Sequence, residues 1–308
     1  MLLDGQKILI TGTYGFLGRF LANKFSKLGA TIYGIGHGKL SSKELYDNGI
    51  THYVCGELKI STLKDTCEKP NKIIHCASSA SVPYSVLYPK EDFERTINST
   101  LEVLEFMRLY AKDAKLVIPS SAAVYGQKEK KQISVRSRLN PVSPYGNSKR
   151  MVETLTNFYG NHFKLKISIV RLFSLYGPGL KKQLLWDACQ KISLGNNLYS
   201  GTGLETRDWI YIDDAASLIL LALENASIST PIFNGGSGKA LSIKELLSFL
   251  YREFGIDMTP DFNGIVRDGD PLYFKADIKE SLALGWEPNI FWKDGVLEYI
   301  KWYKSIYL

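Results

Sequence analysis

The beginning of the chain constrains the fold more than any other segment. Residues 7–11 form a short apolar run rich in β-forming side chains, and the run ends at Gly12. Apolar residues then recur at helical spacing from Phe16 to Phe25, before a second apolar run at residues 31–35. A strand, a helix and a strand in this order predict a βαβ unit whose two strands lie parallel in one sheet.

The same alternation continues as far as Leu172. Further strands are expected at residues 51–55, 73–76, 115–119 and 166–172, and helices at residues 93–111 and 145–163. Continuous apolar strands that alternate with helices are typical of a parallel sheet covered on both faces. The expected fold is therefore α/β, with a Rossmann-type doubly wound parallel sheet.

Turn signals become dense after residue 173, as in Tyr176-Gly177-Pro178-Gly179. The length of 308 residues favours two domains or one large α/β unit. We expect a Rossmann domain at residues 1–173 and a smaller C-terminal α/β domain at residues 174–308. A strand at residues 232–234 is a candidate to return to the first sheet.

Composition argues against several other classes of protein. Apolar residues make up 45% of the chain and charged residues 22%, which is typical of a globular protein with an ordinary core. No apolar run approaches the ~20 residues of a membrane span, and the first residues lack the layout of a secretory signal. Four cysteines form no Cys-x-x-Cys pair and have no histidine at ligand spacing, so we expect neither a metal site nor disulfides. A reducing compartment fits this use of cysteine, and we expect a cytoplasmic location. The four cysteines are Cys55, Cys67, Cys76 and Cys189.

The charge balance indicates the kind of partner. Lys and Arg number 38 against 31 Asp and Glu, which gives a net charge of +7. This excess suits an anionic small molecule, and equally it could serve solubility alone. The dense basic run at residues 128–131 is better explained as a solvated loop than as a nucleic-acid surface. We expect neither a nucleic-acid nor a membrane partner.

A glycine-rich loop lies between the first strand and the first helix. Glycines permit a tight turn and a close approach of the backbone, and a helix N-terminus offers N–H groups to a dinucleotide pyrophosphate. The spacing Gly-x-x-Gly-x-x-Gly differs from the general fingerprint, and the alternative is a turn needed only for close packing of the helix on the strand. The predicted cofactor contacts in this loop are Gly12, Tyr14, Gly15, Phe16, Leu17 and Gly18.

The loop after the second strand bears on which cofactor is used. Enzymes that use NAD usually place a carboxylate here for the ribose 2′-hydroxyl. This chain has Gly36-His37-Gly38-Lys39 instead, with no acid to repel a 2′-phosphate. His37 and Lys39 could attract one, so the loop slightly favours NADP(H) over NAD(H). The alternative for Lys39 is a solvated loop residue.

Tyr145 and Lys149 have the spacing of a catalytic pair. Residues four apart lie on one face of a helix, and Pro144 suits the first turn. A nearby ammonium group is expected to lower the pKa of the Tyr145 phenol and make it a usable acid or base. On its own, this spacing also fits a solvated pair.

A second segment strengthens the catalytic interpretation. Residues 115–119 predict a strand that runs into Ser120 and Ser121 at its carboxyl end, where ligands bind in parallel sheets. Ser121 can therefore hydrogen-bond the same substrate oxygen as Tyr145. The alternative is an ordinary turn at the end of a strand.

Together these motifs resemble the extended short-chain dehydrogenase/reductase family, and most closely its nucleotide-sugar epimerase/dehydratase branch. The resemblance runs along nearly the whole chain. Its segments are the glycine loop, residues 121–126, Tyr145-x-x-x-Lys149, Asn98, residues 171–179, residues 207–214 and residues 285–288.

The resemblance implies a nicotinamide cofactor, NAD(H) or NADP(H), in the first domain and a nucleoside-diphosphate sugar in the second. Tyr145 would be the acid and base, Lys149 would hold the nicotinamide ribose, and Ser121 would orient the substrate hydroxyl. The remaining cofactor contacts would be His37, Lys39, Glu57, Leu58, Ala77 and Asn98, and the substrate contacts Ser121, Ser174, Arg207 and Arg267. The family often dimerises through helices of its first domain, so a homodimer is expected.

Departures from the family pattern narrow the reaction. Dehydratases place Asp-Glu directly after the active-site Ser or Thr, where this chain has Ala122-Ala123. The C3/C5 epimerase-reductases place a Cys and a His where this chain has Ala123 and Gly179. Neither dehydration nor carbon-acid epimerisation is therefore supported.

The remaining reactions require only hydride transfer at the sugar C4. We expect a 4-epimerase that acts through a transient 4-keto sugar, with a one-way 4-keto-sugar reductase or a nucleotide-sugar 4-dehydrogenase as alternatives. Ser174 replaces an Asn usual in 4-epimerases, and Ala80 replaces a lysine of UDP-galactose 4-epimerases, so strict UDP-galactose chemistry is in doubt. Outside this class, the alternative is a non-catalytic dinucleotide-binding scaffold or redox sensor.

Overall fold

The computed structural model describes residues 2–79, 81–126, 131–265 and 272–307. The chain divides into two compact units, each assembled from three segments. The first unit comprises Met1–Val124, Pro141–Arg171 and Ala216–Phe233. The second unit comprises Tyr125–Asn140, Leu172–Ala215 and Asn234–Leu308.

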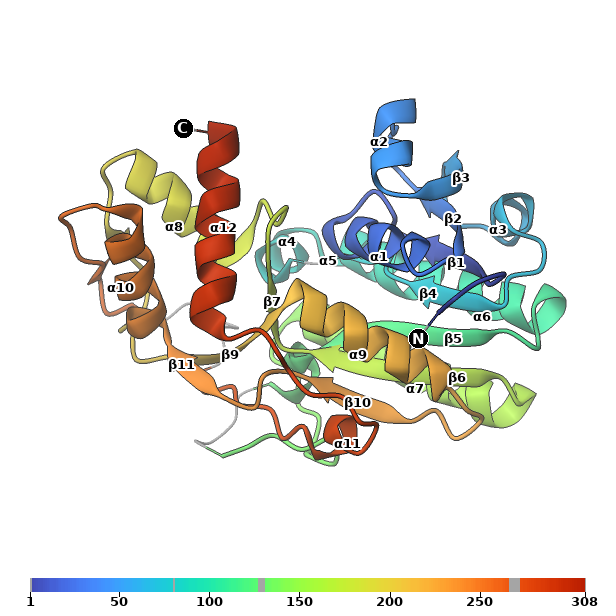
Figure 1. Cartoon of the computed structure of the whole chain (residues 1–308). Coiled ribbons are helices and arrows are strands. Elements are labelled where there is room, and N and C mark those ends of the chain that lie inside the picture. Colours follow the sequence, from blue (N-terminus) through green and yellow to red (C-terminus); the bar gives the residue numbers. More distant parts are fainter. Residues whose placement is uncertain (1, 80, 127–130, 266–271, 308) are drawn as a thin grey trace. The chain divides into compact units, whose positions relative to one another are not determined.

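The main sheet is mostly parallel and has the strand order β10-β6-β5-β4-β1-β2-β3 (Figure 1). Its strands are β1 (Lys7–Thr11), β2 (Thr31–Gly36), β3 (Ile50–Cys55), β4 (Lys72–His75), β5 (Lys115–Ser121), β6 (Lys166–Leu172) and β10 (Ile232–Gly235). β1 is parallel to both neighbours, with Ile10 opposite Gly34 of β2 and Ile74 of β4. The predicted Rossmann-type, doubly wound α/β fold is confirmed.

The strand order reverses between β1 and β4. The chain proceeds outward from β1 to β2 and β3, and then crosses over to β4 on the other side of β1. The carboxyl ends of strands at such a point form the usual ligand site of an open parallel sheet. Gly12 follows β1 and Ala77 follows β4, so these two segments flank the expected site.

Apolar side chains on both faces of the sheet hold the helices. One buried cluster joins Leu9, Ile73 and Leu116 of the strands to Phe106 and Val152 of the covering helices. These helices are α3 (Ile60–Thr66), α6 (Ser99–Tyr110) and α7 (Pro144–Phe163), and α1 (Phe16–Ser26) covers the opposite face (Figure 1). The shorter elements are α2 (Ser42–Asp47), α4 (Val82–Leu87), α5 (Pro89–Phe93), the π-turn Glu94–Asn98 and the 3₁₀ turn Ala122–Tyr125. The helix α9 (Ile212–Glu224) spans the division between the units.

The start of α7 is fixed by local sequence. The Ser143 hydroxyl accepts a hydrogen bond from the Gly146 N–H at 3.1 Å, which caps the helix. Pro144 occupies the first position, where a missing N–H costs nothing. Tyr145 and Lys149 are therefore held in the first two turns of a well-capped helix.

The second unit contains smaller sheets. β9 (Thr206–Tyr211) lies between β7 (Ser174–Tyr176), to which it is parallel, and β11 (Ala240–Ser242), to which it is antiparallel. β8 (Leu198–Tyr199) pairs with β12 (Asp261–Phe262). The helices of this unit are α8 (Gln183–Ser193), α10 (Ile243–Phe254), α11 (Lys279–Leu282) and α12 (Trp292–Tyr307).

Two buried carboxylates organise the second unit. Asp208 of β9 accepts hydrogen bonds from the backbone N–H groups of Ser237, Gly238 and Ala276 at 2.6–3.0 Å. Asp214 accepts from the N–H groups of Asn289 and Ile290, each at 3.0 Å. Asp208 and Asp214 of the motif at residues 207–214 thus anchor loops.

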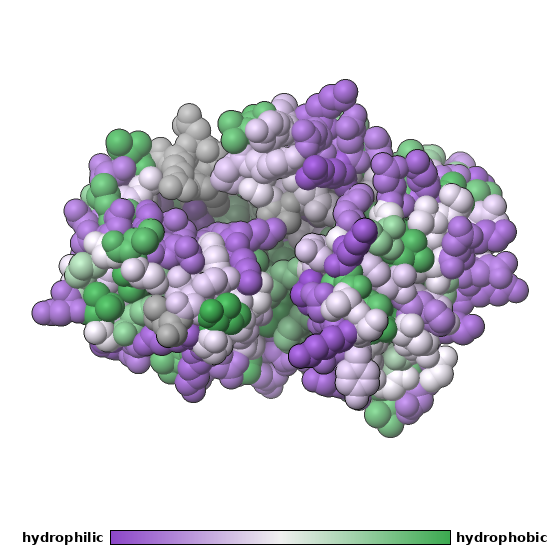
Figure 2. Space-filling view, turned by 90° about the horizontal axis from the view of Figure 1, so that it is seen from above, coloured by the Kyte–Doolittle hydropathy of each residue, from purple (hydrophilic) through white to green (hydrophobic). Residues whose placement is uncertain are grey.

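The surface is mixed in polarity. On the face drawn in Figure 2, apolar side chains are interspersed among polar ones. Within the described ranges, no helix is both long enough and apolar enough to span a bilayer.

Candidate active site

The structure brings Ser121, Tyr145 and Lys149 together in the first unit. Ser121 is the last residue of β5, and its side chain lies close enough to the Tyr145 phenol to act on its pKa. The first turn of α7 lies directly against the chain after β5, because a Cβ atom at Gly146 would lie 2.7 Å from the Ala123 carbonyl oxygen. Only glycine allows this approach, which places the Tyr145 hydroxyl beside Ser121.

Lys149 is buried, with 5% of its surface exposed. Its ammonium group donates hydrogen bonds to Ser78 Oγ at 2.9 Å and to the Pro119 carbonyl at 3.2 Å. Burial lowers the pKa of Lys149 to about 8, although electrostatic interactions with Cys76, Asp92 and Glu153 oppose the shift. Lys149 therefore keeps most of its charge at neutral pH.

The expected effect of Lys149 on Tyr145 is not what the structure shows. Burial raises the pKa of the Tyr145 phenol; the nearby Ser121 side chain opposes this rise, and the charge of Asp92 adds to it. Lys149 Nζ lies 6.0 Å from the centre of the Tyr145 ring and is directed toward Ser78 and Pro119. The predicted lowering of this pKa is therefore wrong, because the effect of burial outweighs the opposing one.

A buried ion pair supports this part of the sheet. Glu153 and Arg171 are joined at 2.7 Å, with 5% and 3% of their side chains exposed. The Ser120 hydroxyl donates to Glu153 at 2.6 Å. The pair thus ties α7, β5 and β6 together beneath Ser121. Sequence reasoning missed it, although a glutamate four residues after Lys149 falls on the same buried helix face.

The glycines of the loop between β1 and α1 have two different roles, close packing and room for a ligand. A Cβ at Gly12 would lie 2.7 Å from the Ala77 nitrogen, and one at Gly18 would lie 2.4 Å from the Gly12 carbonyl oxygen, so close packing explains both. Gly15, by contrast, has an ordinary extended conformation (φ −76°), and its Cβ would meet only the Gly12 oxygen, at 3.2 Å. It precedes α1 and offers no side chain to the first N–H groups of the helix. The loop therefore fits a cofactor pyrophosphate at this helix N-terminus.

The remaining loop residues lie around the same end of the sheet. Tyr14 is about half exposed, and its ring packs against Gly38. Its carbonyl accepts from Arg19 Nη2 at 3.2 Å. His37 and Lys39 are exposed after β2, and Gly36 ends that strand without an acidic side chain. Phe16 and Leu17 open α1.

The predicted cofactor contacts farther along the chain lie in different surroundings. The Ala77 N–H donates to Thr11 Oγ1 at 3.2 Å, beside the Gly12 turn. Leu58 is partly buried against the core cluster. Glu57 is exposed and forms an ion pair with Lys59 at 2.9 Å, and Lys59 lowers its pKa. Asn98 is exposed at the end of the π-turn.

The predicted substrate residues lie largely in the second unit. Ser174 begins β7 opposite Trp209, and Arg207 lies in β9, where its Nη1 donates to the Thr206 carbonyl at 3.0 Å. Arg267 lies outside the described residues, as does Ala80. In the part of the chain that the structure describes, no three His, Cys, Asp or Glu side chains are grouped to hold a metal ion.

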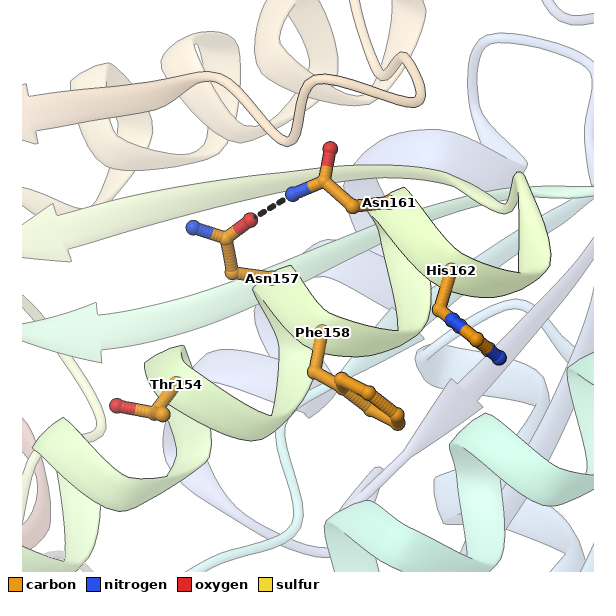
Figure 3. Close-up of a pocket in the computed structure, with 5 residues that line it drawn as sticks. All are labelled: Thr154, Asn157, Phe158, Asn161 and His162. Atoms are coloured by element: carbon orange, nitrogen blue, oxygen red, sulfur yellow. Dashed lines mark hydrogen bonds between the residues drawn. The ribbon is translucent and has the colours of Figure 1, made fainter.

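A hollow on α7 lies away from the catalytic pair. It is lined by Thr154, Asn157, Phe158, Asn161 and His162, and its two asparagines are hydrogen-bonded (Figure 3). Phe158 follows Lys149 by nine residues, which at about 100° per residue turns it to the opposite side of the helix. This hollow therefore has no part in the chemistry of Tyr145.

Comparison with known proteins agrees with this geometry. The sequence profile described as "NAD dependent epimerase/dehydratase family" matches residues 8–236. The chain belongs to this family. It is 31% identical to a CDP-paratose 2-epimerase from Salmonella typhi, over 98% of this chain and 100% of that protein. It is 27% identical to a UDP-glucose 4-epimerase from Lactobacillus helveticus, over 97% and 98% of the two chains.

A solved structure supports the same assignment. It is the UDP-glucuronic acid 4-epimerase from Bacillus cereus in complex with UDP-glucuronic acid and NAD, with 25% identity and a TM-score of 0.87. The match covers 98% of this chain and 100% of the other. This member of the NAD-dependent epimerase/dehydratase family is thus an extended short-chain dehydrogenase/reductase, and relatives of this family are nucleotide-sugar epimerases.

Proposed function

We propose that this protein is an NAD(P)-dependent nucleotide-sugar 4-epimerase acting through a transient 4-keto sugar. The observation that carries the proposal is the placement of the Ser121 side chain beside the Tyr145 phenol, on the helix that also carries buried Lys149. The relatives named above act on nucleotide-linked sugars, and two of the three are 4-epimerases. A non-catalytic scaffold would have no need of this intact set.

Each residue of the site has its own role in the proposed reaction. The glycine loop would hold a nicotinamide cofactor, which would supply reversible hydride transfer at the sugar C4. Ser121 orients the C4 hydroxyl, and Tyr145 takes its proton during oxidation and gives a proton back during reduction. Lys149 would hold the ribose of that cofactor. Arg207, together with Arg267, supplies guanidinium groups for the diphosphate.

The side chains after Ser121 favour epimerisation over dehydration. Dehydration requires an acid and a base close to the sugar, and Ala122 and Ala123 provide neither. The loop with Gly36, His37 and Lys39 favours the alternative, a one-way NADP(H)-dependent reductase. Conversely, NAD is the cofactor named with the Bacillus cereus relative.

One experiment distinguishes these reactions. The purified protein is denatured, any released nicotinamide is identified by mass spectrometry, and UDP-glucose, UDP-glucuronic acid and CDP-linked sugars are then tested for C4 inversion by NMR. Retained NAD with inversion of one sugar is the expected result. An empty site with NADPH-dependent reduction of a 4-keto sugar would replace the epimerase by the reductase.

A homodimer is the expected assembly. The outward faces of α6 and α7 expose Leu101, Leu109, Met151 and Phe158 to extents of 40–53%. A second copy could cover this face with the same face of its own, as in a twofold interface. Light scattering is expected to give a dimer mass for the wild type and a monomer mass for Phe158→Asp.

A further inference from the structure

Asp92 of α5 is a buried carboxylate that no part of the proposed reaction uses. None of its surface is exposed. The Ser148 hydroxyl donates to Asp92 Oδ2 at 2.7 Å. The other oxygen, Oδ1, has no hydrogen-bond partner within the described part of the chain. A buried carboxylate with a single hydrogen bond is costly to fold, so its position next to the catalytic residues calls for an explanation.

The segment that carries Asp92 holds the catalytic turns of α7 at two points. Ser148 is the residue before Lys149, so the Asp92 hydrogen bond fixes the second turn of the helix. Ser85 of α4 is also fully buried, and its Oγ accepts the Tyr145 backbone N–H at 3.0 Å. Two adjacent short helices thus contact α7 at Tyr145 and Ser148.

The charge of Asp92 also acts on both catalytic groups. It raises the pKa of the Tyr145 phenol, and it is among the charges that raise the pKa of Lys149 against the effect of burial. Within α5, Lys90 is exposed and Glu91 is bonded to Tyr84 and Arg95. The other titratable or charged groups around Lys149 are His75 at the end of β4, Cys76 directly after it, Glu153 on α7, and Arg171 on β6, which pairs with Glu153.

We propose that Asp92 is a positioning residue, whose carboxylate fixes the start of α7 through Ser148 and sets the electrostatic balance between Tyr145 and Lys149. This role rests on the proposed function for its effect on catalysis. Its effect on Lys149 exists whether or not the substrate is correctly identified. The two can therefore be tested separately.

The test substitutes Asp92→Asn, which keeps the size and one acceptor oxygen but removes the charge. Lys149 is observed by NMR in lysine-labelled protein, with its signal assigned from Lys149→Arg. We expect the Lys149 titration to move below about 8. We also expect both limbs of the pH profile of kcat to move to lower pH, and kcat at neutral pH to fall by roughly tenfold.

Two further variants separate charge from packing. Glu94→Gln removes the same charge at an exposed site two residues away and is expected to leave titration and turnover unchanged. Asp92→Glu keeps the charge in a larger side chain. Both limbs of its pH profile of kcat should therefore match those of the wild type, even if kcat itself is lower. Loss of turnover in Asp92→Asn without movement of the Lys149 titration would overturn the proposal and leave Asp92 a packing residue. A moved titration with no C4 inversion of any nucleotide sugar by the wild type would instead contradict the proposed function alone.

Discussion

Glu153 lies one helical turn beyond Lys149 and forms a buried ion pair with Arg171 of β6. Two nitrogens of the guanidinium, Nε and Nη2, donate to the carboxylate at 2.7–3.2 Å. Ser120 adds a third donor from β5. The ion pair therefore fixes the helix with the proposed acid–base residue to the strand with the proposed orienting serine.

Removal of one partner is expected to destabilise the first unit. Glu153→Gln leaves the Arg171 charge without a buried counter-charge, which typically costs about 3–5 kcal/mol. Denaturant unfolding followed by circular dichroism should show this loss in the free energy of unfolding. The double substitution Glu153→Leu with Arg171→Met should recover much of it, and a single variant as stable as the wild type would contradict this account.

Tyr145→Phe is expected to lower turnover by at least 100-fold, because the phenol is the only acid–base group assigned to the substrate hydroxyl. The ring remains, so thermal unfolding and cofactor binding should change little. Turnover is measured with the sugar identified by the NMR assay. Activity close to that of the wild type would show that another group transfers the proton.

Gly15→Ala separates the cofactor role of the glycine loop from its packing role. The backbone conformation at Gly15 suits alanine, and the added Cβ would meet only one atom within 4 Å. The melting temperature of this variant should therefore stay close to that of the wild type. The methyl group would lie over the N-terminus of α1, and cofactor affinity by calorimetry should fall about tenfold. Gly18→Ala is the matched comparison and is expected to destabilise the protein, since its Cβ would lie 2.4 Å from the Gly12 oxygen. Unchanged cofactor affinity in Gly15→Ala would favour the packing-only alternative.

The sheet could be predicted because its signals are local. Apolar runs, a glycine turn and helical spacing each occupy about ten residues, and the helix expected at residues 145–163 is Pro144–Phe163. The division into units could be found only in part in this way, although the strand expected at residues 232–234 does join the main sheet as β10. The return of Ala216–Phe233 to the first unit depends on contacts far apart in sequence.

The site was predictable only in part for the same reason. The Tyr145–Lys149 spacing is a local pattern, but the direction of the Lys149 ammonium depends on Ser78 and Pro119, which lie 71 and 30 residues away. The sign of the Tyr145 pKa shift was therefore missed. No local signal marks Asp92 as buried either, because an acidic residue after Pro89 and Lys90 equally suits an exposed helix start.

Arg207→Ala should weaken binding of the nucleotide sugar far more than binding of the cofactor. The loss of one guanidinium–phosphate contact typically costs about 1.5–3 kcal/mol, or roughly 10- to 100-fold in affinity. Calorimetry with UDP and with NAD+ measures the two separately. Equal losses for both ligands would indicate a general structural defect and would remove Arg207 from the substrate site.

His75 predicts how stability depends on pH. The ring is buried, with Nδ1 2.8 Å from Thr11 Oγ1 and Nε2 3.1 Å from Thr100 Oγ1, and burial lowers its pKa to about 3, with Lys149 adding to the shift. A histidine whose pKa is lower in the folded than in the unfolded protein stabilises the fold fully above about pH 6.5. That contribution is lost progressively as the pH falls from about 6.5 toward 3, by up to a few kcal/mol. His75→Gln stays neutral throughout, so its free energy of unfolding should fall less steeply across this range than that of the wild type. If the free energies of unfolding of the two proteins fall in parallel with pH, His75 is not the group whose protonation destabilises the fold.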